Sequence, residues 1–187
     1  MSLLSLRDAI VQRLASEVPQ LVSVEAHDGD FTLEEIKRHF GHHPRAARVV
    51  CLGLGTTEDI GGQPVAPARW AVFVACRQQG AGDPDGAISP GDACTVLATR
   101  IVELAHEETW NGQAFRVPQN ISARNLYTGR LSKHGLSLWA VEWEQPIVLD
   151  GRTATDLDRL ALIHTDYDVG SGPDHATDTE FPEPEES

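Results

Sequence analysis

Long apolar runs are missing from this 187-residue sequence, and none approaches the roughly 20 consecutive apolar residues that a membrane-spanning helix requires. The N-terminus also lacks the basic start and the small-residue cleavage site of a secretory signal peptide. The hydrophobic content of 41% is ordinary for a soluble globule. We therefore expect a chain that folds in a cytoplasm and has no membrane partner.

Cysteine is scarce, with only Cys51, Cys76 and Cys94. None of them belongs to a CxxC pair, and an odd number argues against a disulfide framework. Cys51 and Cys76 lie in apolar runs and Cys94 in a predicted helix. We interpret all three as buried free thiols rather than as reactive or metal-binding groups.

Basic residues are few, because 15 Lys and Arg stand against 28 Asp and Glu, a net charge of −13. The imbalance is concentrated from Asp150 onward, where 11 acids and two bases give −9 and leave −4 for residues 1–149. DNA binding depends on Lys and Arg displacing counterions from phosphates. This charge balance therefore argues against a protein that binds DNA specifically.

Catalytic motifs are missing as well, since the chain has no HExxH, no GxSxG and no Walker lysine. We therefore predict a protein that is not an enzyme, with no catalytic residue, no cofactor and no metal ion. The alternative from another class is a small metal-dependent hydrolase, since imidazole and carboxylate groups are suitable metal ligands. Its candidate ligands are His27, Asp30, Asp166 and Asp168.

Hydrophobic spacing predicts three helices. The first is capped by Ser5 and stops before Pro19, the second runs from Thr32 to Gly41, and the third and longest is capped by Ser89. The apolar stripes expected to face the core are Leu6, Ile10 and Leu14 in the first helix and Leu97, Ile101, Leu104 and Ala105 in the third.

Predicted strands cover residues 20–26, 49–52, 70–76, 120–131 and 136–147. The continuous apolar runs at 49–52 and 70–76 are typical of central strands that are covered on both faces, and residues 53–68 between them are interpreted as a loop. The last two strands form a long hairpin with a bend at residues 132–135. In its second strand Val141 and Trp143 alternate with Glu142 and Glu144, so one side faces water or a partner.

These elements predict one α/β (α+β) domain over residues 1–168, with a mixed or antiparallel central sheet flanked by two to three helices and with a long extended β-hairpin. Residues 169–187 have too little apolar area to offset the entropy of ordering, so they are expected to form a flexible acidic tail. Trp70, Trp110, Trp139 and Trp143 are interpreted as core residues, and a subunit contact is the alternative for the last two. Trp110 is placed at the end of the longest predicted helix.

Three segments resemble one known family. Residues 118–129 (PQNISARNLYTG) and 135–145 (GLSLWAVEWEQ) carry the specific part of the similarity, and residues 25–35 (EAHDGDFTLEE) add to it. They resemble the tail-completion (tail terminator) family of Mu-like phages over roughly residues 3–168.

The resemblance implies a structural virion protein that assembles in the host cytoplasm and sits in the neck of the particle, at the head-proximal end of the tail. There it stops polymerisation of the tail tube and joins the tail to the head connector. Related terminators form six-fold rings of α/β subunits, so the implied partners are further copies of the chain, the tail tube protein and the head–tail connector or stopper protein. Genomic DNA would pass through the ring lumen without specific binding.

Long strands offer unpaired edges and polar faces to neighbouring copies. The residues that we single out as a possible assembly interface are Asn120, Arg124, Asn125, Tyr127, Arg130, Glu142 and Glu144. A head–tail stopper or neck adaptor is the alternative within the structural class, and co-purification with filled heads rather than with tails would identify it.

Overall fold

Six strands form one mixed sheet in the computed structural model, which describes residues 2–29, 36, 38, 40, 42–77, 88–126, 131 and 133–149. The order across the sheet is β1-β2-β4-β6-β5, with β3 pairing with β4 off this path. β1 is parallel to β2 and every other pair is antiparallel. The strands are β1 Ser23–Ala26, β2 Arg45–Leu54, β3 Glu58–Ile60, β4 Gln63–Arg77, β5 Gln119–Asn125 and β6 Leu136–Val148.

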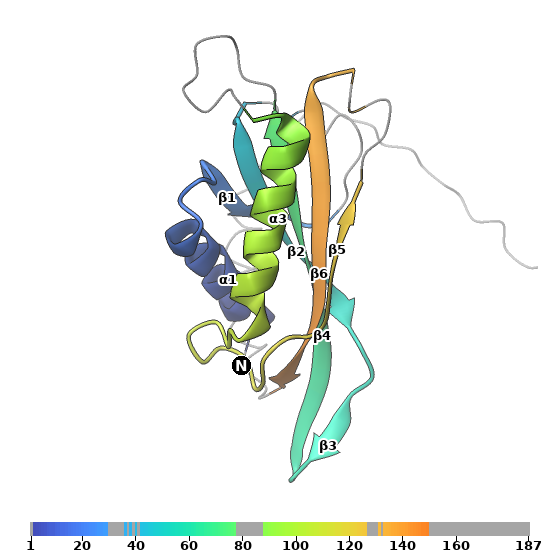
Figure 1. The fold of residues 1–187 in the computed structure, drawn as a ribbon. Helices are drawn as coiled ribbons and strands as arrows, with labels where there is room; N and C mark the ends of the chain where they lie inside the picture. The colour runs from blue at the N-terminus through green and yellow to red at the C-terminus, as the bar shows by residue number, and fades with distance from the viewer. Residues whose placement is uncertain are drawn as a thin grey trace, which may run out of the picture.

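Two helices, α1 (Leu3–Glu17) and α3 (Pro90–His106), lie against the same face of this sheet (Figure 1). The prediction of a mixed α/β fold with a helix-flanked sheet is therefore confirmed. No helix among the described residues is long and apolar enough to span a membrane. The predicted end of the domain at residue 168 and the predicted acidic tail at 169–187 lie outside the described residues.

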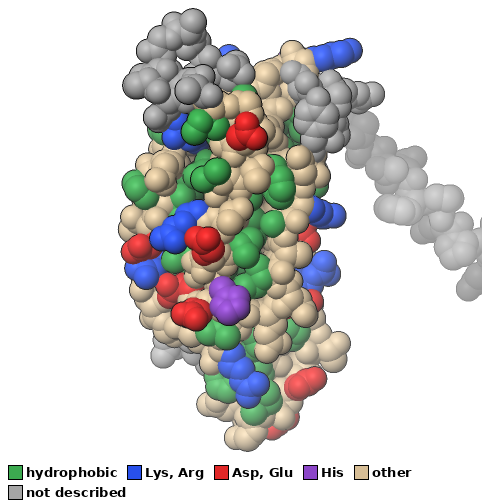
Figure 2. All heavy atoms as spheres, viewed as in Figure 1, with side chains coloured by type: hydrophobic (Ala, Val, Ile, Leu, Met, Phe, Trp, Pro, Cys, Tyr) green, Lys and Arg blue, Asp and Glu red, His purple; other side chains and the backbone are tan. Residues whose placement is uncertain are grey.

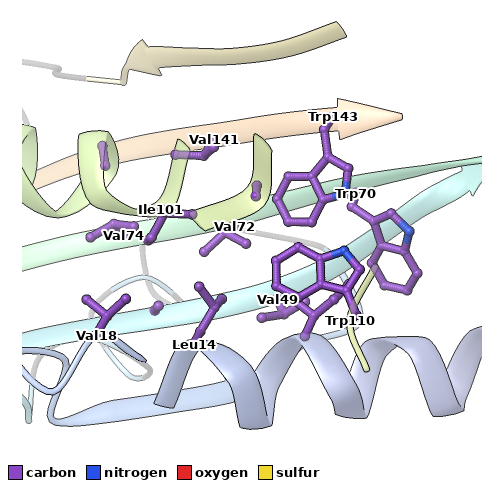
Figure 3. Close-up of a cluster of buried hydrophobic side chains, with 14 of the residues drawn as sticks. Leu14, Val18, Val49, Trp70, Val72, Val74, Ile101, Trp110, Val141 and Trp143 are labelled. Carbon is purple, nitrogen blue, oxygen red and sulfur yellow. The ribbon is translucent and has the colours of Figure 1, made fainter. Parts of the chain in front are cut away.

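The main core fills the space between the helices and this face (Figure 3). Leu14 of α1 and Ile101 of α3 are fully buried against strand residues such as Val72. Three of the four tryptophans, Trp70, Trp110 and Trp143, are also almost fully buried, which confirms the core interpretation for them. Trp139 is partly buried at the border of this cluster.

The opposite face of the sheet has a smaller apolar cluster. Ile36 and Phe40 are helical and buried there, together with Leu131, Leu136 and Leu138. The guanidinium of Arg48 lies 5.3 Å from the centre of the Phe40 ring and 3.4 Å from a carboxylate oxygen of Glu25. Burial lowers the pKa of Arg48 and the negative charge of Glu25 opposes that shift. This buried cation joins β1 and β2 to Phe40.

Both helix starts follow from their capping residues. Ser89 is the N-cap of α3 as predicted, since its Oγ accepts the Asp92 N–H at 3.1 Å. The predicted cap of the first helix is wrong: α1 begins at Leu3 because the Oγ of Ser2 accepts the Leu4 N–H at 3.1 Å, and Ser5 lies inside the first turn. The predicted stripes are buried except for Leu104, which is partly buried.

The prediction of a loop over residues 53–68 is also wrong. β2 continues to Leu54, and a tight hairpin joins β3 to β4 through Gly61 and Gly62, whose φ angles are 64° and 83°. Two consecutive positive φ angles give the hairpin turn whose twist matches that of paired strands. Asp59 closes the turn, because its Oδ1 accepts the Gly62 N–H at 2.8 Å. We call residues 56–66 the β3–β4 arm; it extends beyond the helices at one end of the molecule (Figure 1).

The predicted long hairpin corresponds to the antiparallel pair β5–β6. β5 is shorter than predicted, because it ends at Asn125 and Leu131 is helical. A bulge near its start gives Asn120 a φ angle of 54° and shifts the register between Gln119 and Ser122. Residues 127–130 lie outside the described residues.

Candidate functional site

The predicted interface residues fall mostly on the face of β5 and β6 that is turned away from α1 and α3. Glu142 and Glu144 alternate with the core residues of β6, so their side chains stand on the opposite side of the sheet. Arg124 of β5 bonds Glu142, and the Asn120 amide nitrogen donates to a Glu144 oxygen at 2.9 Å. The structure therefore brings four of the seven predicted residues together.

The other three predicted residues are not part of this group. Asn125 follows Arg124 directly and pairs in register with Trp139, so strand alternation turns it towards the helix-covered face. Tyr127 and Arg130 lie outside the described residues. These positions show where the side chains lie. That the residues form an assembly interface stays a prediction.

Charges on this polar face are paired rather than concentrated. The Arg124 side chain is 66% exposed and the Glu142 side chain 27% exposed, so water screens most of their attraction. Exposed pairs of this kind contribute about 0–1 kcal/mol to stability. Arg69 of β4 stands opposite Glu144 in register and adds a further exposed base to the same face. The face is hydrated, of mixed charge, and suited to specific polar contacts.

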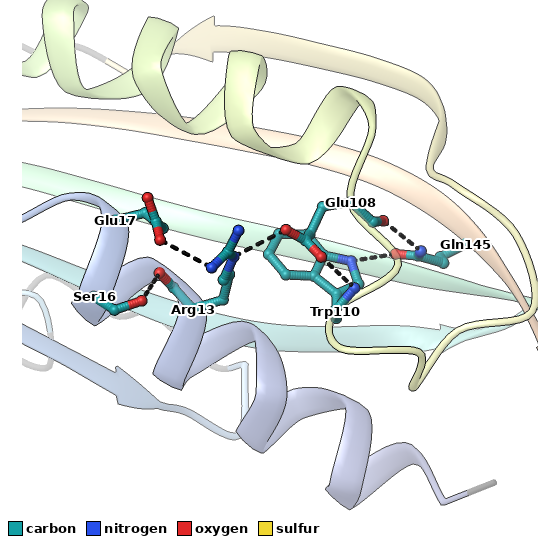
Figure 4. A network of polar contacts seen from close by, with 6 residues as sticks. All are labelled: Arg13, Ser16, Glu17, Glu108, Trp110 and Gln145. Carbon is teal, nitrogen blue, oxygen red and sulfur yellow. Dashed lines mark hydrogen bonds and ion pairs between the residues drawn. The ribbon is translucent and has the colours of Figure 1, made fainter.

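A second polar group is buried and lies at the end of the molecule from which the β3–β4 arm extends. Gln145 of β6 is fully buried, and its Oε1 accepts the indole N–H of Trp110 at 2.6 Å and that of Trp143 at 3.2 Å. Its Nε2 donates to the carbonyl oxygens of Arg116 at 2.8 Å and Glu108 at 3.3 Å. One amide therefore fixes two indoles and two points of the segment 107–118. Figure 4 shows its bonds to Trp110 and Glu108.

Glu108 links that segment to α1. Its Oε2 accepts from Nε of Arg13 at 2.9 Å, and its Oε1 accepts the backbone N–H of Trp110 at 3.0 Å. Arg13 also bonds Glu17 at 2.9 Å within α1 (Figure 4). The segment is thus held from the helix layer as well as from the sheet.

The backbone of this segment is strained. Trp110, Asn111 and Gly112 have φ angles of 53°, 59° and 74°, in the left-handed region that costs a non-glycine residue roughly 1–2 kcal/mol. Trp110 lies in this segment and not at the end of α3 as predicted, since α3 ends at His106. Its ring stacks on Trp143 with the ring centres 5.6 Å apart, and this contact and the bonds of Gln145 offset the strain.

The three cysteines are free, and Cys76 and Cys94 are buried, as predicted; Cys51 is only partly buried. The Cys94 thiol lies 3.3 Å from the carbonyl oxygen of Ser137 and contacts Cys76. The hydrogen bond between the two thiols and burial raise the pKa of Cys76, and the same bond lowers the pKa of Cys94. Burial raises the pKa of Cys51.

Of the alternative metal ligands, only His27 is described, and its Nδ1 accepts the Gly29 N–H at 3.0 Å. Asp30, Asp166 and Asp168 lie outside the described residues. Within the described part of the chain, no three His, Cys, Asp or Glu side chains are grouped so that they could hold a metal ion.

Comparison of the sequence with models of known protein families and with curated proteins gives no match. The structure defines the class as a mixed α/β fold with α1 and α3 on one face of a six-stranded sheet. The further residues that the sequence analysis missed lie on the β3–β4 arm and in the segment 107–118. The glycine pair Gly61–Gly62 was a signal for the arm, whereas no local signal marks the buried role of Gln145.

Proposed function

We propose that this chain is a structural phage protein, a tail terminator that forms a ring at the head-proximal end of the tail. In this role it stops the tail tube from growing and presents a surface to the head connector. The work is done by shape and self-association, without the making or breaking of a covalent bond.

The observation that carries the proposal is the stretch Gln119 to Gln145, which resembles the Mu-like tail-completion family. In the structure this stretch contributes β5 and β6, one outer flank of the sheet. Its polar residues Asn120, Arg124, Glu142 and Glu144 stand on a face that α1 and α3 leave uncovered. The resemblance thus falls on a part of the surface where a neighbouring protein can bind.

The shape of the molecule is consistent with a ring subunit. The sheet ends in β1 on one side and in β5 on the other, and the free side of each pairs with no described strand. The rigid core occupies the middle, so each flank is available to a different neighbour. Closed rings need two different surfaces of this kind on each subunit.

The charge of the chain fits a channel through which DNA slides. With a net charge of −13, the chain as a whole repels phosphates instead of holding them. On the side that carries the helices, acidic and basic side chains lie interspersed, without a broad basic area (Figure 2). DNA passing a ring of such subunits would meet little attraction.

Disruption of the gene in the phage that carries it tests the proposal. We expect heads and tails that are not joined, with tails that are unattached or too long, because nothing caps the tube. Normal infectious particles from the disrupted phage would contradict the proposal. Complementation with the intact gene is the control.

Fractionation of tails and heads from the unmodified phage separates the terminator from a neck adaptor. A terminator should remain with the tails when tails and heads are fractionated, together with the tail tube protein. Recovery of the chain with filled heads instead would assign it to the stopper or adaptor class.

A further inference from the structure

The outer part of the β3–β4 arm, residues 56–64, is exposed, whereas Val65 and Ala66 at its base are buried. Its three β3 residues, Glu58, Asp59 and Ile60, are all exposed, and Ile60 keeps 39% of its surface accessible. Only three residue pairs join β3 to β4. The base of the arm is held by the sheet, because Val65 pairs with Val148 of β6 and the Leu149 N–H donates to the Pro64 carbonyl oxygen at 2.8 Å. The tip around Gly61 and Gly62 lies beyond this pairing and carries Ile60 next to two acidic residues, where a partner can reach it.

A surface of complementary character lies at the same end of the molecule. We call residues 115–117 the receiving segment. Phe115 and Val117 are 40% and 42% exposed, and the guanidinium of Arg116 lies 5.3 Å from the centre of the Phe115 ring. Arg116 forms no ion pair with any described residue. The receiving segment is therefore apolar and basic, whereas the arm is apolar and acidic.

The receiving segment is held in place before any partner binds. The Phe115 N–H donates to the Pro146 carbonyl oxygen at 3.1 Å, and the buried amide of Gln145 holds the Arg116 carbonyl at 2.8 Å. The strained turn at Trp110 to Gly112 precedes it, with two residues between them. Backbone strain that the surroundings keep in place is typical of functional surfaces, and a preorganised surface loses little entropy on binding.

The arm and the receiving segment lie on opposite flanks of the sheet. The arm begins level with the receiving segment and reaches beyond it, because Ile60 pairs with Gln63, four residues beyond Pro67 on β4. Pro67 of β4 pairs in register with Pro146 of β6. On the outer side of Pro146, Phe115 continues the line of β5; on the outer side of Pro67, the Gly55 N–H donates to its carbonyl oxygen at 2.8 Å and the chain leads into β3. When copies stand side by side in one orientation, the arm flank of each faces the receiving flank of the next.

We propose that the β3–β4 arm of one copy binds the receiving segment of the next copy, with Ile60 against Phe115 and Val117 and with Glu58, which shares the strand face of Ile60, near Arg116. This inference rests on the proposed function and names the contact that closes the ring. It is a head-to-tail contact, because the two surfaces differ. Opposite charges fix its direction, and the apolar residues at its centre contribute most of the affinity.

Two aspartate substitutions test the contact in the full-length chain by sedimentation in the analytical ultracentrifuge. Ile60→Asp spoils only the arm and Val117→Asp spoils only the receiving segment, and each should weaken association by roughly 30-fold or more, the effect of losing a central interface residue. Val96→Asp is the matched control, because Val96 is 64% exposed and lies on α3, which belongs to neither surface. Circular dichroism verifies that all three variants fold.

Mixing the two defective variants makes the test specific. Ile60→Asp keeps an intact receiving segment and Val117→Asp keeps an intact arm, so an equal mixture has one working contact and should form dimers that grow no further. Monomers in each separate solution and dimers in the mixture are the expected result. A mixture that stays monomeric overturns the inference.

The remaining outcomes separate this inference from the proposed function. If the unmodified chain forms rings and both aspartate variants form the same rings, the arm contact is wrong and the terminator proposal stands. If the unmodified chain stays monomeric at the highest concentration it tolerates, both are overturned. If Val96→Asp disrupts assembly as strongly as Ile60→Asp does, the assigned surfaces are wrong.

Discussion

The two faces of the sheet differ in the interactions that their side chains make. The face under α1 and α3 is closed by fully buried aliphatic and aromatic side chains, whereas the face of β5 and β6 beyond the small cluster carries exposed, charge-paired residues. The first arrangement is stabilised by removal of apolar area from water, and the second contributes little to stability because water screens it. The difference separates a tightly packed side of the sheet from a hydrated side of mixed charge, to which the proposed function assigns the partners.

The largest effect that would test this comparison comes from the core. Ile101→Ala removes a fully buried side chain of α3 from between the helix and the sheet, and it should lower the free energy of unfolding by about 2–5 kcal/mol. Chemical denaturation measures the change. Val96→Ala on the exposed side of the same helix is the control and should change stability by less than about 0.5 kcal/mol. Equal effects at the two positions would show that the faces of α3 are wrongly assigned.

The buried amide is next in size. Gln145→Leu nearly preserves the side-chain volume but leaves two indole N–H groups and two carbonyl oxygens without their partner. The free energy of unfolding should fall by about 1–3 kcal/mol. The substitution should also weaken assembly, because the Arg116 carbonyl is released. Gln119→Leu on the exposed strand β5 is the matched control for stability. A loss of stability without any loss of assembly would separate Gln145 from the receiving segment.

The polar face should respond weakly. Arg124→Ala removes the exposed pair with Glu142 and should change the free energy of unfolding by less than about 1 kcal/mol, with the difference shrinking as salt is added. If the β5–β6 face binds a neighbour, the same substitution should reduce the association with tails. A change in thermal stability comparable to that of Ile101→Ala would contradict this division of the two faces.

The smallest expected effect concerns pH. Burial raises the pKa of the Cys51 thiol above its ordinary value of 9.0, so above pH 9.0 the unfolded chain releases a proton that the folded chain retains. The stability contributed by this thiol is present below that pH and is lost as the pH rises towards the folded-state pKa. Denaturation at rising alkaline pH should therefore show a steeper decline for the unmodified chain than for Cys51→Ala. Identical slopes would show that the thiol does not contribute.

Local signals in the sequence were sufficient for the elements that depend on neighbours along the chain. The cap at Ser89 and the apolar spacing of Leu97 and Ile101 predicted α3, and the apolar runs predicted the centres of β2 and β4. The loop predicted over residues 53–68 failed because glycine and proline content outweighed the turn signal of Gly61–Gly62. The start of α1 failed because Ser2 and Ser5 are both suitable caps.

The surfaces depended on contacts that no local pattern carries. The conformation of residues 110–112 is set by Gln145 and Glu108. Trp110, which donates to Gln145, lies 35 residues before it in the chain. Arg124 and Asn125 are consecutive strand residues, so their side chains point to opposite faces of the sheet. Placing both on one interface was therefore inconsistent with a regular strand. The register across β5 was also unpredictable, since the bulge at Asn120 shifts it.

Electron microscopy of phage tails isolated before they join heads would show whether this chain terminates the tube. We expect a ring of copies of this chain on the head-proximal end of the tube, with each β3–β4 arm lying against residues 115–117 of the adjacent copy. Tails that end without such a ring although the chain is produced, or particles that contain the chain elsewhere, would contradict it.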